Sequence, residues 1–226
     1  MICLISRFKD RTMIKIKTFV FNPFMENTYL VYDETGETLV IDPGCYQKEE
    51  EEELQKYIAD NDLKVVRLIN THCHIDHVLG NQFIKDLYGV NLSIHKKDEE
   101  TLRSVKVYAP NYGFQHFVES EQDDYLAEDD VVSFGNSQFK VMFVPGHAPG
   151  HIALYNEEEK IVIGGDVLFN GSIGRTDLPG GDFDTLINSI HTQLFKLGDD
   201  TVVYCGHGEN TTIGAEKRSN PYCAIK

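Results

Sequence analysis

The chain has 226 residues, of which 41% are hydrophobic and 25% charged, and its formal net charge is −15. This composition is typical of a globular protein with a sizeable core and excludes an intrinsically disordered chain. The length fits one domain spanning residues 1–226. Because so negative a charge repels nucleic-acid phosphates, we expect no nucleic-acid partner.

The cysteines and the first residues bear on the cellular compartment. The five cysteines are odd in number and lack zinc-finger spacing, which argues against a disulfide framework and favours a reducing cytoplasm. Residues 1–12 have too short an apolar stretch for a signal peptide, and no later run approaches the roughly 20 residues of a membrane-spanning helix. We therefore expect a cytoplasmic protein without a membrane partner, with residues 1–12 as an N-terminal extension. The oligomeric state does not follow from the sequence.

Strand patterns and helix patterns alternate along the first half of the chain. Leu54, Tyr57 and Ile58 have helical spacing, whereas alternating or continuous β-branched residues indicate strands. The predicted strands are residues 13–19, 28–32, 38–41, 65–69 and 90–94, and the predicted helices are residues 50–60 and 78–87.

The second half repeats this plan. Its predicted strands are residues 138–144, 152–155, 160–163 and 201–204, and its predicted helix is residues 183–195. No flexible linker divides the halves. Two β-rich halves flanked by helices predict stacked layers that share one core.

Residues 98–128 are polar, contain scattered aromatic residues and fit a helix with a surface loop. Tyr108, Tyr112 and Phe114 fit two interpretations, either as part of a loop over the active site or as ordinary packing residues. The sequence favours packing but does not decide between them.

Four potential metal ligands occur within six positions directly after a predicted buried strand. They are His72, His74, Asp76 and His77. Imidazole nitrogens and carboxylate oxygens suit zinc, iron or manganese. Side chains of this kind would repel one another if charged and would lack partners if buried without a metal. The segment therefore predicts a metal site.

Three further candidates lie in glycine-containing loops that follow strand-like segments. His147, Asp166 and His207 each have a glycine as the preceding residue, which lets the backbone approach a site closely. Each alone would also fit an ordinary turn. Together with the first cluster they become specific for one site.

The ordered set of candidates resembles the metallo-β-lactamase superfamily over nearly the whole chain. The set is His72, His74, Asp76, His77, His147, Asp166 and His207. The resemblance implies an α/β fold, a four-layer αββα sandwich with the metals at one edge. It also implies that Asp42 orients the ligands.

The resemblance further implies a dinuclear centre. His72, His74 and His147 would hold one metal, Asp76, His77 and His207 the other, and Asp166 would bridge both. Asp76 and Asp166 would thereby position the metals and a bridging hydroxide. Two divalent ions about 3.5–4 Å apart can activate a shared water for attack on a carbonyl. Zinc is expected first, with iron or manganese as alternatives.

Residues 145–151 and 165–169 resemble the short glyoxalase II-like branch of the superfamily. This implies a metal-dependent hydrolase whose substrate is a small-molecule thioester, S-lactoylglutathione or a related acyl thioester. The thiolate leaves readily because its conjugate acid has a pKa of about 8.5. His151 lies outside the usual ligand set, so a packing or supporting role is expected for it.

Other functions remain as alternatives. Residues 171–177 also resemble persulfide dioxygenases, which would bind one iron through His72, His147 and Asp166. A hydrolase of another ester or a lactone would use the same site, and a non-enzymatic metal-binding module is the remaining alternative.

Arg175 is the candidate substrate-binding residue. It would either hold a substrate carboxylate or pair with Asp177 to fix its loop. Two relatives are disfavoured, because Asp166 stands where zinc β-lactamases have cysteine and His74 where diiron flavoproteins have glutamate.

Overall fold

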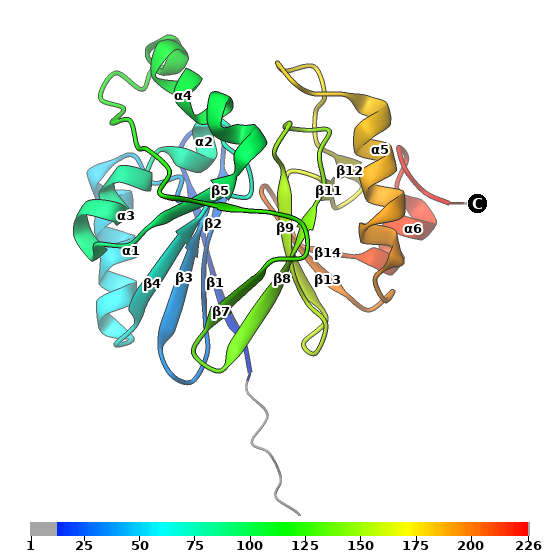
Figure 1. The fold of residues 1–226 in the computed structure, drawn as a ribbon, viewed down its shortest axis with the longest axis horizontal. Coiled ribbons are helices and arrows are strands. Elements are labelled where there is room, and N and C mark those ends of the chain that lie inside the picture. The colour runs from blue at the N-terminus through cyan, green and yellow to red at the C-terminus, as the bar shows by residue number, and fades with distance from the viewer. Residues whose placement is uncertain (1–12, 226) are drawn as a thin grey trace, which may run out of the picture.

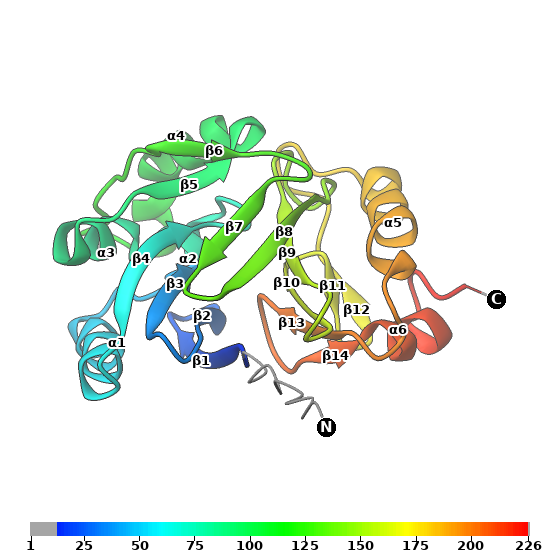
Figure 2. The same ribbon diagram turned by 60° about the horizontal axis from the view of Figure 1, so that its bottom comes forward.

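The computed structural model describes residues 13–225, so the predicted N-terminal extension, residues 1–12, lies outside the described part. Two six-stranded sheets face each other (Figures 1 and 2). The first sheet runs, in spatial order, β1 (Lys15–Phe21), β2 (Glu26–Tyr32), β3 (Glu37–Ile41), β4 (Lys64–Ile69), β5 (Leu92–His95) and β6 (Asp124–Leu126). Strands β1 to β3 are antiparallel, and β3 to β6 are parallel.

The second half of the chain builds the other sheet. Its order is β14 (Thr211–Thr212), β13 (Val202–Cys205), β10 (Ile161–Gly165), β9 (Ile152–Asn156), β8 (Ser137–Phe143) and β7 (Val131–Phe134). A short hairpin of β11 (Leu168–Phe169) and β12 (Ser172–Ile173) follows β10.

Helices cover the outer face of each sheet (Figure 1). The first sheet carries α1 (Lys48–Asp60), α2 (Ile75–Val78), α3 (Asn81–Tyr88) and α4 (Glu99–Tyr108), and the second carries α5 (Phe183–Thr192) and α6 (Ile213–Ser219). Short 3₁₀ turns are η1 (Lys96–Asp98), η2 (Ala109–Tyr112) and η3 (Leu194–Lys196). The predicted four-layer αββα sandwich is confirmed. None of the described helices is long and apolar enough to cross a membrane.

Alternation along the strands explains why three apolar layers form. In β2, Tyr29 and Val31 point toward the second sheet, whereas Leu30 packs on the helix side. In β3, Leu39 and Val40 divide in the same way. Successive strand side chains point to opposite faces, so a strand buried on both faces is apolar throughout.

The predicted helix over residues 78–87 is wrong as one element. The structure ends α2 at Val78 and begins α3 at Asn81. Between them the Gly80 amide donates to the carbonyl of Pro43 at 2.8 Å, and a Cβ at Gly80 would lie 2.4 Å from Cys45 Sγ. Tertiary contact at this glycine interrupts the helix.

The undecided region contains α4, in agreement with the helix considered there. Several other elements were not predicted, namely β6, β7, β11, β12, β14 and α6. Most are too short to show a period in the sequence. Helix α6 begins where the Thr212 hydroxyl accepts a hydrogen bond from the Ala215 amide at 3.2 Å.

Candidate metal centre

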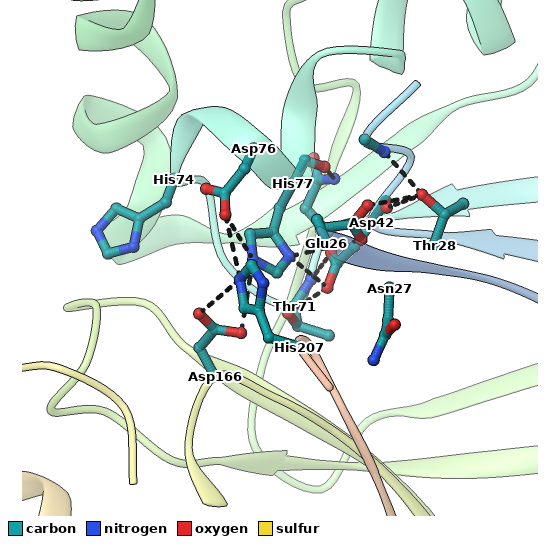
Figure 3. A network of polar contacts seen from close by, with 12 residues as sticks. Glu26, Asn27, Thr28, Asp42, Thr71, His74, Asp76, His77, Asp166 and His207 are labelled. Carbon is teal, nitrogen blue, oxygen red and sulfur yellow. Dashed lines mark hydrogen bonds and ion pairs between the residues drawn. The ribbon is translucent and has the colours of Figure 1, made fainter. Parts of the chain in front are cut away.

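The predicted ligands converge at one edge of the sandwich because the strands before them end there. His72 to His77 follow β4, His147 follows β8, Asp166 follows β10 and His207 follows β13. The parallel pairs β3–β4 and β10–β13 bring carboxyl ends together at the same edge. Figure 3 shows Asp76, His77, Asp166 and His207 pointing toward one another.

Three groups of three potential ligands occur among the described residues. Two match the predicted sets, and the third comprises Asp42, His72 and His77. The ligating atoms of His72, His74 and His147 lie within 4.8 Å of one another, and the same holds for Asp76, His77 and His207. In the first group His74 Nδ1 is 2.9 Å from His147 Nε2. In the second, His207 Nε2 is 3.2 Å from Asp76 Oδ2.

Asp166 lies between the two groups. Its Oδ2 is 3.5 Å from His147 Nε2 and 3.4 Å from His207 Nε2, and its Oδ1 is 3.5 Å from His77 Nε2. Only glycine fits beside it at position 206, because a Cβ there would lie 2.0 Å from Asp166 Oδ1. Both groups therefore share one carboxylate.

Several buried atoms at this edge have no hydrogen-bond partner among the described residues. They include His72 Nε2, His77 Nε2 and Asp166 Oδ1. Buried polar atoms left unpaired cost free energy, and nearly all such atoms in folded proteins have a partner. A divalent cation would satisfy nitrogen and oxygen donors of this kind. The residues present thus fit a metal.

The electrostatics of the two groups differ. Burial, together with neighbouring histidines, holds the pKa of His72 well below its usual value and lowers that of His74 to about 3. Burial also disfavours charge on His207, but hydrogen bonds with Asp166 and Asp76 outweigh it and raise the pKa to about 10. The first group is neutral, the form in which imidazole binds metals. A cation at the second group would displace protons.

Asp42 supports His77 from the side away from Asp76 and Asp166 (Figure 3). Asp42 Oδ2 is 3.3 Å from His77 Nδ1. Its two oxygens also accept hydrogen bonds from the Thr71 amide at 2.7 Å and the Thr71 hydroxyl at 2.6 Å. A carboxylate at Nδ1 orients the ring so that Nε2 faces the site.

Backbone carbonyls hold two more imidazoles. His147 Nδ1 lies 2.7 Å from the carbonyl of Arg175, and His207 Nδ1 lies 3.1 Å from that of Phe24. Asn27 fixes the His207 loop by donating to the carbonyl of Cys205 at 2.8 Å. With Nδ1 as the donor in each contact, Nε2 faces the site, where on His207 a bound metal would take the place of a proton.

His151 and Arg175 lie beside the proposed ligands but belong to neither group. His151 Nε2 accepts a hydrogen bond from the Asp166 amide at 3.0 Å, and its ring stacks on His72 with centroids 4.7 Å apart. The exposed Arg175 side chain forms two hydrogen bonds with Asp177, at 2.7 and 2.8 Å. The guanidinium is therefore already paired, and only the Arg175 carbonyl contacts a predicted ligand.

Two buried carboxylates near the site were not predicted. Asp98 accepts hydrogen bonds from the amides of Cys73 at 2.6 Å and Gly150 at 3.0 Å, so it ties together the two loops that carry the first group. Glu26 is fully buried, and its Oε1 lies 3.9 Å from His77 Nδ1. In the sequence, Asp98 lies among other charged residues that do not distinguish it, and nothing around Glu26 indicates a functional role.

The model of the metallo-β-lactamase superfamily matches residues 21–207. The chain belongs to this superfamily. Hydroxyacylglutathione hydrolase GloC of Haemophilus influenzae is 37% identical to this superfamily member over 215 residues, which are 94% of the chain and 100% of that protein.

Solved structures agree with this placement. BLEG-1, described as a B3 metallo-β-lactamase, superposes with a TM-score of 0.85 and 31% identity over 93% of the chain and 100% of its own. TTHA1623 in a di-iron-bound form superposes with a TM-score of 0.81 and 33% identity over 91% of the chain and 99% of its own. ETHE1 from Myxococcus xanthus superposes with a TM-score of 0.75 and 26% identity over 93% of the chain and 84% of its own.

Proposed function

We propose that this superfamily member is a metal-dependent thioester hydrolase with a dinuclear centre. Its substrate would be S-lactoylglutathione or a related small acyl thioester. The observation that carries the proposal is the shared position of Asp166, within 3.5 Å of histidines from both groups. The identity to GloC, named as a hydroxyacylglutathione hydrolase, supports the substrate class.

The proposal assigns the ligands to two ions. One ion is assigned to His72, His74 and His147, the other to Asp76, His77 and His207, and Asp166 to both. When bound, two divalent ions lower the pKa of a shared water and stabilise negative charge that develops on a carbonyl oxygen. The di-iron form of TTHA1623 supports two ions, with zinc, iron or manganese as candidates here.

The chain's own residues prepare the site for this chemistry. Asp42 and the carbonyls of Arg175 and Phe24 hold His77, His147 and His207 so that each presents Nε2. In hydrolysis, water adds to the thioester carbonyl carbon, the C–S bond breaks, and a carboxylic acid and a thiol result. Because a thiolate is a good leaving group, no separate acid is required.

A mononuclear iron persulfide dioxygenase is the alternative. The likeness to ETHE1 favours it, and its ligands would be His72, His147 and Asp166. The likeness to BLEG-1 leaves hydrolysis of another ester, a lactone or a lactam as a variant of the same chemistry.

One paired assay separates these functions. Metal content per chain is measured alongside thiol release from S-lactoylglutathione and oxygen uptake with glutathione persulfide. We expect about two ions per chain and thiol release without oxygen uptake. One iron per chain with oxygen uptake and no thiol release would overturn the proposal. Bound metal without either activity would also contradict it and would leave the other hydrolase substrates or a non-enzymatic module.

A further inference from the structure

Four aromatic side chains gather beside the second group of ligands. This aromatic patch comprises Phe24, Tyr108, Tyr112 and Phe114. The Phe24 ring lies 6.0 Å from Tyr112 and 6.1 Å from Phe114, and Tyr108 lies 5.8 Å from Tyr112. The turn between β1 and β2 thus meets the segment after α4, which lies about 90 residues later in the sequence.

The patch has a buried base and an exposed face. Phe114 is 3% exposed and packs edge-on against Tyr46 at 4.8 Å. By contrast, Phe24 is 39% and Tyr112 55% exposed. Core packing therefore explains Phe114 but not the two rings in front of it, and exposed aromatic groups that cluster commonly mark a binding surface.

The backbone of the patch adjoins the metal centre. The carbonyl of Phe24 is 3.1 Å from His207 Nδ1, so the residue that carries one exposed ring also holds a proposed ligand. Burial raises the pKa of the Tyr108 hydroxyl, and the negative charge of Asp76 adds to the increase. The patch is therefore linked to the loop of His207 through the Phe24 carbonyl.

The turn that carries Phe24 is rigidly held. Asn22 and Met25, on either side of it, have positive φ angles of 52° and 55°. The Asn22 side chain donates to the carbonyls of Gly44 and Asp76, both at 3.0 Å, and so ties the turn to the ligand loop. Residues kept in this strained backbone region occur where the surrounding structure fixes them, often at functional sites.

We infer that the aromatic patch binds a flat, apolar substituent of the thioester, so that the site prefers aryl thioesters to short aliphatic ones such as S-lactoylglutathione. This inference rests on the proposed function and, within it, favours the related acyl thioesters over S-lactoylglutathione as the substrate. The thioester carbonyl would lie at the ligands while the substituent stacks on Phe24 and Tyr112. The substituent could belong to the acyl group or to the thiol, since the patch recognises only its shape and apolar surface.

The test compares thioesters that differ in one group. The metal-loaded protein is assayed with three thioesters. S-acetyl-N-acetylcysteamine has no aryl group, S-benzoyl-N-acetylcysteamine carries one on the acyl side, and S-benzyl thioacetate carries one on the thiol side. We expect one aryl ester to be preferred in kcat/KM by about tenfold, and Tyr112→Ala to reduce that preference about three- to tenfold. The matched control is Tyr222→Ala, because Tyr222 is a similarly exposed tyrosine, at 57%, and the preference should be unchanged.

Equilibrium binding provides a readout that does not depend on turnover. Non-hydrolysable S-benzyl and S-methyl thioethers are titrated calorimetrically into the metal-loaded protein and into both variants. Tighter binding of the benzyl compound that is lost in Tyr112→Ala supports the patch even if no thioester is cleaved, in which case only the proposed function fails. Equal binding of the two thioethers, or an equal loss for both in Tyr112→Ala, overturns the inference.

Discussion

Two buried aspartates join the two sheets at opposite ends of the sandwich, and their surroundings differ. Asp33, in the turn after β2, accepts hydrogen bonds from the amides of Thr35 at 2.9 Å and Asn136 at 2.7 Å, and from the Ser137 hydroxyl at 3.0 Å. Asp166 faces histidines at 3.4 to 3.5 Å, and its Oδ1 has no hydrogen-bond partner among the described residues.

The difference indicates a structural role for Asp33 and a cation-binding role for Asp166. Protein donors satisfy Asp33, as expected of a group that stabilises the fold. Asp166 has other acceptors and imidazoles around it instead, an arrangement that favours an added cation. Burial alone would not separate them, since Asp33 is 2% and Asp166 7% exposed.

The largest effect is expected at Asp166. Asp166→Asn keeps the size of the side chain but removes the charge shared by the two groups of ligands. Bound metal should fall below two ions per chain, and kcat/KM should fall by about a hundredfold or more. Elemental analysis and thiol-release kinetics measure both. Asp33→Asn is the matched control and should keep its metal. Equal metal loss in the two variants would contradict a specific metal-binding role for Asp166.

Asp98→Asn should weaken metal binding about 10- to 100-fold, as loss of a supporting carboxylate commonly does. An amide in place of the carboxylate leaves one of the donors, the Cys73 or Gly150 amide, without an acceptor, so the ligand loops lose their common anchor. Competition with a chelator measures the affinity. The control is Asp200→Asn, because Asp200 is an exposed aspartate paired with Lys160, and its loss should leave the metal affinity unchanged. Unaltered metal affinity in Asp98→Asn would show that the ligand loops are held without Asp98.

Asp33→Asn should lower the free energy of unfolding by about 1–3 kcal/mol through lost charge-assisted hydrogen bonds. Burial alone would raise the pKa of Asp33, but hydrogen bonds from Thr35, Asn136 and Ser137 outweigh it and lower the pKa. The stabilisation is therefore present above the unfolded pKa of about 3.9 and is lost as pH falls through the lower folded value. Denaturant unfolding is measured at pH 7 and pH 3. The difference in the free energy of unfolding between Asp33→Asn and the unmutated chain should be smaller at pH 3, and an equal difference at both pH values would contradict this.

The smallest effect is expected at Arg175, because Asp177 already pairs with it. Arg175→Gln should raise KM for the anionic S-lactoylglutathione by no more than about threefold, in line with an exposed ion pair. Asp177→Asn should have the opposite effect by freeing the guanidinium. A tenfold or larger increase in KM for Arg175→Gln would show that this arginine binds substrate despite its partner.

The sequence predicted the fold through the order of its ligand motifs, and the strands through their alternation. It could not predict the interruption at Gly80, which depends on contact with Pro43 and Cys45 from a distant loop. Asp98 resembled its charged neighbours, since only its place between two loops distinguishes it. The interpretation of Tyr112 likewise needed the position of Phe24.

Anomalous diffraction from crystals of the metal-loaded protein tests the central claim most directly. Two peaks about 3.5–4 Å apart, one among His72, His74 and His147 and one among Asp76, His77 and His207, with Asp166 touching both, are predicted. A single peak that Asp166 shares only with His72 and His147, at full occupancy, would contradict a dinuclear centre.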